Sequence, residues 1–444
     1  MIYSEGEDMS FLHGAWGIGH GVRHFDPYYL LVVCILLFGV PDAARAQYTP
    51  ERSYQFLEEA FTRNEKDLRD YLIRDIDDYL VTFPYSPYGA RLLRMLGKIH
   101  EQEGRESKAI AAYLKAFYLF PQDPAGNETT SALRRMIATE KKYAEKRSWL
   151  DEYITTVTLD SSRANNLFRY LNLLIRIHDD DLYPYTLENA REFIRLFPGD
   201  PRVPEVMLRT AQVHRDAGEH QIADIVYLKF KMLFPVSPLL PYVLYEQGLL
   251  HYQKLRDPGK ALEIFNRLIS QYPDSTRSGD AMFMIAEIRE EKQNSYLQAI
   301  DDYRKFVDTY PQHPKAAEAL MRIARLKKDK LNLYTEAIEA LQEILAKYPE
   351  NPRGAEALEE IADIYKSKLH DYREAAAALA DIAERYPAYE KAPERLYDAG
   401  ALCERELDDR QLAMHYYEMV LIKFPGHDRA KDAAKRIEKF ERER

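Results

Sequence analysis

Cysteine is scarce in this 444-residue sequence, which contains only Cys34 and Cys403. Cys34 is followed by further apolar residues, whereas a lipid-attachment cysteine should end the apolar region, so we do not expect lipidation there. Removal of the first 46 residues, inferred below, would leave Cys403 alone and exclude an intramolecular disulfide. Cys403 follows Gly400 by three residues on the inner side of a predicted helix, where we expect a packed side chain.

Recognisable catalytic and metal-binding motifs are also lacking. The sequence contains no HExxH, no GxSxG, no GxxxxGK[S/T] and no paired CxxC. His178 precedes three aspartates, but the glycine and the spaced acids of a calcium loop are missing, so we interpret residues 178–181 as a solvated acidic turn. His214 and His220 are too far apart in sequence to share a helical face. We therefore expect no enzyme, no cofactor and no metal site.

A basic surface is absent as well. The chain has 62 lysine and arginine residues against 72 acidic residues, which gives a formal net charge of −10. Lysine and arginine alternate with aspartate and glutamate on the predicted helical faces, which is typical of a solvated surface. Because phosphate binding needs a basic stripe, the composition argues against nucleic acid as a partner.

The amino-terminal apolar run, residues 28–40, is too short for a bilayer span, which needs about 20 residues. Arg23 precedes the run, and a small-x-small sequence ending at Ala46 follows it. These features are typical of a signal peptide, so we predict that residues 1–46 are cleaved on export and that the protein is periplasmic. An uncleaved anchor is the alternative. The stretch before about residue 22 is long for such a segment, and we interpret it as a start-site artefact.

What the sequence has instead is a regular recurrence of an aromatic residue followed by proline. Successive prolines lie 37 to 38 residues apart, except for one interval of 77 that fits two repeats with a degenerate boundary. Periods of about 20 to 50 residues indicate stacked repeat architectures. The pairs are Phe83-Pro84, Phe120-Pro121, Phe197-Pro198, Phe234-Pro235, Tyr272-Pro273, Tyr310-Pro311, Tyr348-Pro349, Tyr386-Pro387 and Phe424-Pro425.

Two rows of small residues divide each repeat into two predicted helices. One row lies twelve residues before the prolines, and the other lies twelve or thirteen residues earlier, so two helices can approach closely at these points. Apolar residues between the rows follow helical spacing, as in Ala261, Ile264 and Leu268. Proline ends the second helix because it disfavours the α conformation of the preceding residue. No repeat contains a convincing strand pattern, and the sequence therefore predicts an all-α fold.

The repeats resemble the tetratricopeptide repeat, a helix-turn-helix of about 34 residues with two fixed small positions and a closing proline. One repeat carries the motif at Leu358, Ile361, Ala362, Tyr365, Ala375 and Pro387. The resemblance extends over residues 51–444, although the repeats are longer than usual and residues 122–196 fit poorly. The long period and the Tyr-Pro endings look most like the bacterial envelope members of the family, including those of outer-membrane assembly and Tol-Pal coordination.

The resemblance implies an α-solenoid of about ten tandem helix pairs with superhelical stacking. We expect the solenoid to occupy residues 47–425, with degenerate repeats within 122–196. Residues 426–444 are predicted to form a capping helix, because a stack of repeats must cover the apolar face at its end.

In the tetratricopeptide family the first helix of each pair lines a concave groove, and the resemblance assigns groove positions relative to its small residue. Counting from Gly248 and Ala286 yields an aromatic surface that offers a large contact area to a bound peptide or helix. Its residues are Tyr242, Tyr245, Leu249, Tyr252 and Phe283. The alternative is that these side chains only fill space between adjacent helices.

Together these features predict an exported, non-enzymatic scaffold that binds other proteins or peptides in the bacterial envelope, with peripheral membrane association left open. Two alternatives are an accessory helical subunit of a cell-wall enzyme and a cytosolic adaptor. The first alternative would need a catalytic pocket, and the second would need a protein that stays inside the inner membrane.

Overall fold

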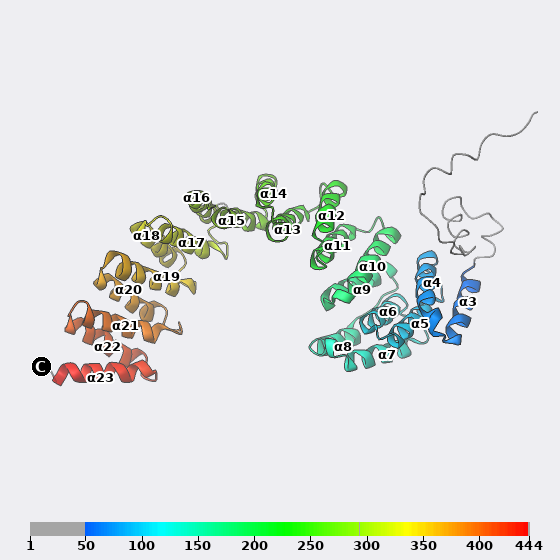
Figure 1. Ribbon diagram of the computed structural model, residues 1–444, viewed down its shortest axis with the longest axis horizontal. Coiled ribbons are helices and arrows are strands. Elements are labelled where there is room, and N and C mark those ends of the chain that lie inside the picture. Colours follow the sequence, from blue (N-terminus) through cyan, green and yellow to red (C-terminus); the bar gives the residue numbers. More distant parts are fainter. Residues whose placement is uncertain (1–48, 293, 443–444) are drawn as a thin grey trace, which may run out of the picture. The chain divides into compact units, whose positions relative to one another are not determined.

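The computed structural model describes residues 49–292 and 294–442, and every regular element within these ranges is a helix (Figure 1). The predicted all-α class is thus confirmed. The predicted signal peptide lies outside the described residues. The chain divides into an amino-terminal unit, Met1–Tyr185, and a carboxy-terminal unit, Thr186–Arg444, and each is described by itself. The boundary falls within α10 (Tyr183–Leu196).

The amino-terminal unit contains seven further α-helices and three single-turn 3₁₀ helices among its described residues. The α-helices are α3 (Pro50–Arg63), α4 (Arg69–Thr82), α5 (Gly89–Gln102), α6 (Glu106–Leu119), α7 (Gly126–Thr139), α8 (Arg147–Thr156) and α9 (Arg163–Ile177). The 3₁₀ helices are η1 (Lys66–Leu68), η2 (Lys141–Tyr143) and η3 (Asp180–Leu182).

Packing in the amino-terminal unit is sequential up to α6 and then changes. Helices α3 to α6 each contact the next one, but α6 packs against α7 and also against α9. The buried Tyr170 of α9 donates a hydrogen bond to the carbonyl oxygen of Ala111 in α6, at 3.0 Å. Its ring lies 6.0 Å from that of Tyr118, also in α6. The α7–α8 hairpin therefore does not separate α6 from α9, which explains why this stretch departs from the repeat pattern.

A buried carboxylate connects three elements of the amino-terminal unit. Asp179 accepts hydrogen bonds from the hydroxyls of Ser107 (2.8 Å) and Tyr143 (2.6 Å), and it also pairs with Lys142. Burial opposes ionisation of Asp179, but these donors outweigh it and hold its pKa below the usual value. The interpretation of residues 178–181 as a solvated turn is therefore wrong for Asp179, because its side chain joins η3 to η2 and α6.

The carboxy-terminal unit continues as a regular succession of helix pairs. Its helices are α11 (Val203–Asp216), α12 (His220–Leu233), α13 (Leu240–Gln253), α14 (Pro258–Gln271), α15 (Thr276–Glu291), α16 (Tyr296–Thr309), α17 (Ala316–Asp329), α18 (Tyr334–Lys347), α19 (Arg353–Ile364), α20 (Tyr372–Arg385), α21 (Ala392–Arg405), α22 (Arg410–Lys423) and α23 (Asp428–Arg442). A π-helical turn, η4 (Tyr365–Leu369), extends α19. The described residues thus form ten helix pairs followed by α23, as expected for an α-solenoid.

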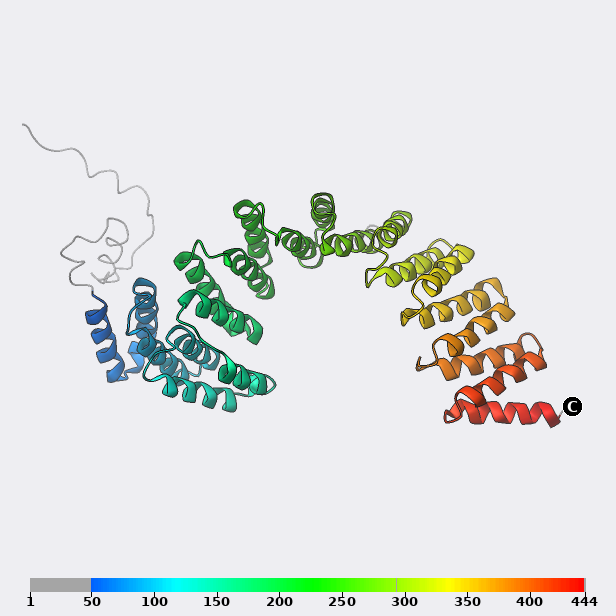
Figure 2. The ribbon, with the colours of Figure 1, turned by 180° about the vertical axis from the view of Figure 1, so that it is seen from behind.

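Each helix from α11 to α23 packs against the next one in the chain, as both views of the ribbon show (Figures 1 and 2). First helices of neighbouring pairs also touch, as in α13 with α15 and α17 with α19. At the end of the stack, α23 packs on α21 and α22, and its buried Phe440 lies 6.4 Å from the ring of Tyr417.

The aromatic-proline pairs end the second helices, as the sequence predicts. Tyr272 and Tyr310 leave the helix with φ of −136° and −125° and ψ of 57° and 60°, which lie outside the α region. The hydroxyl of Tyr310 donates a hydrogen bond to the carbonyl oxygen of Pro273, 3.0 Å away, in the preceding repeat. The aromatic residue therefore both terminates its helix and connects successive repeats.

Glycines in several first helices lie against a ring from the second helix of the same pair. A methyl group on Gly400 in α21 would lie 2.7 Å from Cε1 of Tyr417 in α22. A methyl group on Gly97 in α5 would similarly lie 2.5 Å from Cε1 of Tyr113 in α6. Both separations are shorter than van der Waals contact, so an aromatic residue on one helix requires a small residue on its partner.

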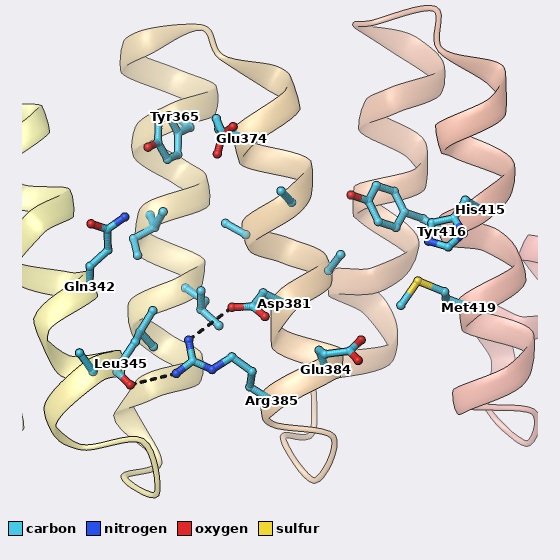
Figure 3. A pocket seen from close by; sticks show the side chains of 16 residues that line it. Gln342, Leu345, Tyr365, Glu374, Asp381, Glu384, Arg385, His415, Tyr416 and Met419 are labelled. Atoms are coloured by element: carbon cyan, nitrogen blue, oxygen red, sulfur yellow. Dashed lines mark hydrogen bonds and ion pairs between the residues drawn. The ribbon is translucent and has the colours of Figure 1, made fainter.

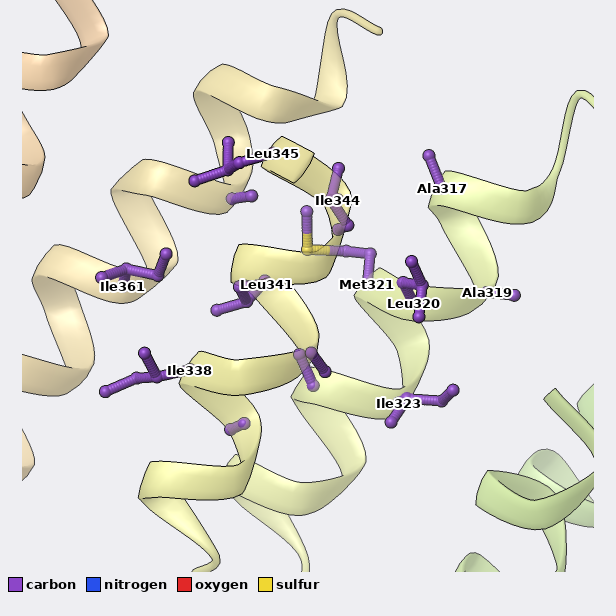
Figure 4. Packing of buried hydrophobic residues seen from close by; sticks show 14 of the residues in the cluster. Ala317, Ala319, Leu320, Met321, Ile323, Ile338, Leu341, Ile344, Leu345 and Ile361 are labelled. Atoms are coloured by element: carbon purple, nitrogen blue, oxygen red, sulfur yellow. The ribbon is translucent and has the colours of Figure 1, made fainter. Parts of the chain in front are cut away.

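The core between pairs consists mainly of aliphatic side chains, and the cluster around α17 and α18 includes residues from α15 to α21. In the cluster around α17 and α18, Leu320, Ile323 and Leu341 are almost completely buried, and Ile361 of α19 lies on the far side of α18 (Figure 4). Burying a side chain of this size stabilises the fold by about 1.5–3 kcal/mol. Because each layer also contacts the next, this stabilisation is distributed along the stack.

Candidate protein-binding surfaces

The five residues predicted to line a groove come together on two neighbouring first helices. Tyr242, Tyr245, Leu249 and Tyr252 follow one face of α13, and Phe283 lies on α15, which contacts α13. We refer to these five residues as the aromatic surface. Tyr242, Leu249 and Tyr252 are partly exposed, whereas Tyr245 and Phe283 are only 8% and 2% exposed.

Tyr245 and Phe283 pack mainly inside the carboxy-terminal unit. The ring of Tyr245 lies 5.9 Å from that of Phe265 in α14, and burial raises the pKa of Tyr245 to about 12. Phe283 contacts the rings of Tyr303 and Phe306 in α16 at centroid distances of 5.4 and 5.6 Å. Both side chains therefore stabilise the contact between helices, and a ligand could reach only the outer members of the aromatic surface.

The outer tyrosines are held in place by polar neighbours. The guanidinium of Arg277 lies 5.0 Å from the ring centre of Tyr242 and 5.3 Å from that of Tyr245. The Tyr242 hydroxyl accepts a hydrogen bond from Nε2 of Gln212 at 3.1 Å. The Tyr252 hydroxyl donates to Oε2 of Glu291 at 2.9 Å. These contacts fix the ring positions and leave parts of the ring faces exposed, which suits a contact surface at low entropic cost.

Along the later first helices the corresponding positions are occupied by ion pairs. Nζ of Lys328 in α17 contacts the carboxylates of Glu360 at 2.5 Å and Asp363 at 3.6 Å, both in α19. Arg325 also contacts Glu360, at 3.5 Å. The surface thus changes from aromatic on α13 and α15 to charged and internally paired on α17 and α19.

A hollow that the sequence analysis did not predict lies on the second helices of the later repeats. We call it the trough; it has a volume of about 730 Å³ and is lined by side chains of α18, α19, α20 and α22 (Figure 3). Ala377, Ala378 and Ala380 of α20 line it with side chains no longer than a methyl group, so the larger residues of α18 and α22 stand on either side. The run of alanines in α20 is the sequence signal that could have indicated it.

The lining of the trough is acidic on α20 and aromatic on α22. Glu374, Asp381 and Glu384 line it from α20, and Tyr416 and Met419 line it from α22 (Figure 3). Arg385, the one arginine in the lining, is held internally: it donates to the carbonyl oxygen of Leu345 at 2.9 Å and contacts Asp381 at 3.4 Å. The trough therefore combines a shallow apolar floor with carboxylates and suits a partner segment that carries apolar and basic side chains.

The described residues provide few candidates for a metal site or a reactive thiol. They contain no group of three or more histidine, cysteine or acidic side chains positioned to hold a metal ion. Burial raises the pKa of the Cys403 thiol to about 11, which leaves it protonated and unreactive at neutral pH. Among these residues no helix combines the length and apolar character needed to cross a bilayer.

Comparison with protein families identifies repeats in three places. A tetratricopeptide repeat model matches residues 280–313 and 318–351, and a second model of that repeat matches residues 90–123. A model described as an outer membrane lipoprotein matches residues 178–292, which include the aromatic surface. No curated protein matches the chain significantly.

Solved structures that resemble the chain include tetratricopeptide repeat proteins, and their sequence identity to it is low. A tetratricopeptide repeat protein from Parabacteroides merdae is 15% identical, with a TM-score of 0.35, over 62% of this chain and 97% of its own. The C-terminal part of a repeat protein from Cytophaga hutchinsonii is 16% identical, with a TM-score of 0.40, over 60% and 98%. PilF of Pseudomonas aeruginosa is 14% identical, with a TM-score of 0.32, over 54% and 97%.

Proposed function

We propose that this chain, a tetratricopeptide repeat protein, is an exported, non-enzymatic scaffold that holds partner proteins in the bacterial envelope, in the periplasm. The repeats support the role in protein binding, because stacked helix pairs display extended surfaces suited to peptide and helical ligands. The match of residues 178–292 to an outer membrane lipoprotein model supports the envelope location. The apolar run and small-x-small sequence ending at Ala46 support export.

The observation that carries the binding role is the trough. Its floor of alanine methyl groups can accept an apolar side chain, and the carboxylate of Glu374 can pair with lysine or arginine beside it. Glu384 already pairs with Nζ of Lys423 at 3.2 Å. The partner segment is thus an extended or helical stretch with apolar anchors and basic neighbours. The outer residues of the aromatic surface, Tyr242, Leu249 and Tyr252, provide a further contact on the first helices.

Filling the trough tests this role without disturbing the core. Ala377 is exposed, so Ala377→Phe adds a ring to the trough, while Ala388→Phe adds the same ring at an exposed position in a turn outside it. Partners co-isolated from the envelope fraction should fall at least about tenfold for Ala377→Phe, because the ring occupies the space of an anchor side chain. Ala388→Phe should retain them. Equal recovery from both variants would contradict binding in the trough.

A second pair of variants tests the aromatic surface. Tyr252→Ala removes an outer ring of α13, and Tyr334→Ala removes a partly exposed tyrosine at the start of α18, where its hydroxyl bonds only to Asn332. We expect Tyr252→Ala to weaken partner recovery more than Tyr334→Ala.

Cell fractionation tests the proposed location. A protein found only in the cytosol would overturn the envelope scaffold.

A further inference from the structure

Helix α12 carries an exposed apolar face within the carboxy-terminal unit. Met232 is 81% exposed and Val236, in the turn that follows α12, is 93% exposed. Six side chains share this face, which we call the α12 stripe: Ile222, Ile225, Leu228, Met232, Leu233 and Val236. Together their exposed fractions equal nearly four fully exposed side chains. The stripe is therefore comparable to the largest apolar patches of monomeric proteins, about 300–600 Å².

Neighbouring repeats show that stacking does not require apolar residues at these positions. The repeat period of 38 residues maps the α12 stripe onto corresponding positions in α14 and α16 and in the turns that follow them. In the α14 repeat these are Lys260, Glu263, Asn266, Ser270, Gln271 and Asp274. In the α16 repeat they are Gln298, Asp301, Arg304, Asp308, Thr309 and Gln312. All twelve are polar, so the α12 stripe is a departure from the repeat that the fold itself does not explain.

The inner face of α12 is already complete without the stripe. Ala223, Tyr227 and Phe230 are buried in the contact with the adjacent helices. Asp224, the only carboxylate of α12, accepts a hydrogen bond from Nε2 of Gln247 at 2.6 Å and lies 3.1 Å from Nε2 of His251. The α12 stripe therefore contains no acidic side chain, although the chain as a whole is acidic.

We propose that the α12 stripe joins two copies of this chain through an antiparallel contact between their α12 helices. A two-fold axis near Leu228 would bring the two ends of the stripe together, with Ile222 and Ile225 of one copy facing Met232 and Leu233 of the other. Such an interface is self-complementary, because the same residues are used on both sides. A patch of about 300–600 Å² is roughly 40–75% of the roughly 800 Å² per partner of a standard interface.

Charge also favours a second copy as the occupant. Two copies of an acidic chain repel each other, and the repulsion is weakest where no carboxylate faces the contact. Lys229 is exposed on the same face of α12, between the positions of Ile222 and Ile225 around the helix. The two-fold axis places both Lys229 side chains on the same side of the contact, where their four-carbon stems can lie along the apolar surface while the ammonium groups reach water.

The test uses the next repeat as the source of substitutions. Ile225→Glu with Met232→Ser gives α12 the residues that α14 has at the corresponding positions, Glu263 and Ser270, so the variant should fold. Sedimentation velocity of the purified protein should show twice the chain mass for the wild type at micromolar concentration. The double variant should sediment as a single chain, with a dissociation constant raised at least about a hundredfold.

The matched control is Ile422→Ser in α22, which removes an isolated exposed side chain at the position that corresponds to Met232. This variant should remain dimeric, and circular dichroism should confirm that all the proteins are folded. Leu228→Cys should also form a disulfide-linked dimer under mild oxidation, because the residue lies beside the proposed axis. A monomeric wild type, a dimeric double variant or a monomeric control would each overturn the proposal.

Discussion

The α6–α9 region of the amino-terminal unit and the repeats of the carboxy-terminal unit are built from similar helices but are held together differently. In the pairs α13–α14 and α21–α22 a second-helix ring meets a glycine of the first helix, as Tyr417 meets Gly400, and every helix from α13 to α22 packs on the next. In α9 the corresponding small position is occupied by Leu174, and α9 packs on α6 through hydrogen bonds from Tyr170 and around Asp179. Where the small residues of the repeat are missing, polar contacts between segments far apart in sequence hold the helices together.

Among the substitutions that test this comparison, Asp179→Ala should cause the largest loss of stability. The substitution leaves the buried hydroxyls of Ser107 and Tyr143 without their acceptor, and we expect the amino-terminal unit to lose about 3 kcal/mol of unfolding free energy. Asp181→Ala is the matched control, because Asp181 is exposed and pairs with the same Lys142. Its cost should be below about 1 kcal/mol. Similar losses in urea unfolding would show that the buried network does not hold this region.

In the carboxy-terminal unit the corresponding perturbation is Gly400→Val. The added methyl groups would collide with the ring of Tyr417, and overpacking of this kind costs about 1–3 kcal/mol. Gly426→Ala provides the control, since a methyl group on Gly426 meets nothing within 4 Å. Thermal unfolding of both variants would measure the difference. A neutral Gly400→Val would mean that the small residues are not needed for close packing.

The stability of the amino-terminal unit should also depend on pH through Asp179. The folded pKa of Asp179 is depressed, so its contribution is fully present above its unfolded pKa and is lost as pH falls through the folded value. The difference in unfolding free energy between wild type and Asp179→Asn should therefore be constant at neutral pH and shrink in the acid range below about pH 4. Urea unfolding at several pH values measures it, and a difference that grows with acidification would contradict the assignment.

The smallest expected effect concerns the reactivity of Cys403 in the carboxy-terminal unit. Because Cys403 is buried and its pKa is raised to about 11, it should not react with a thiol reagent at pH 8 while this unit is folded. In a Cys34→Ser background, labelling of Cys403 as urea increases would report unfolding of the carboxy-terminal unit alone. Rapid labelling of the native protein would show that α21 opens far more readily than the repeat packing implies.

The regular part of the fold could be predicted from the sequence because its determinants are local. Proline disfavours the α conformation of the residue before it, as at Tyr272 and Tyr310, and small residues recur at fixed distances from these pairs. The all-α class and the tetratricopeptide repeats are accordingly confirmed. The contact of α9 with α6 was not predictable, because the bond from Tyr170 to Ala111 joins residues far apart in sequence and follows no period.

The sequence could indicate which residues share a helix face, but it could not indicate how much of each side chain is exposed. The face of α13 that carries Tyr242 and Tyr252 follows from helical spacing alone. How much of each ring is exposed depends on neighbours such as Phe265 and Tyr303, which belong to other helices. The trough forms only where four helices come together, so the sequence alone could not predict it. The alanines of α20 were its only sequence signal.

The most direct test of the proposed scaffold is site-specific photo-cross-linking in living cells, with the photoreactive residue at Ala377 or, as the control, at Ala388. We expect cross-links from position 377 to envelope proteins found outside the cytoplasm, and few or none from position 388. Equal cross-linking from both positions, or adducts confined to cytosolic proteins, would contradict it.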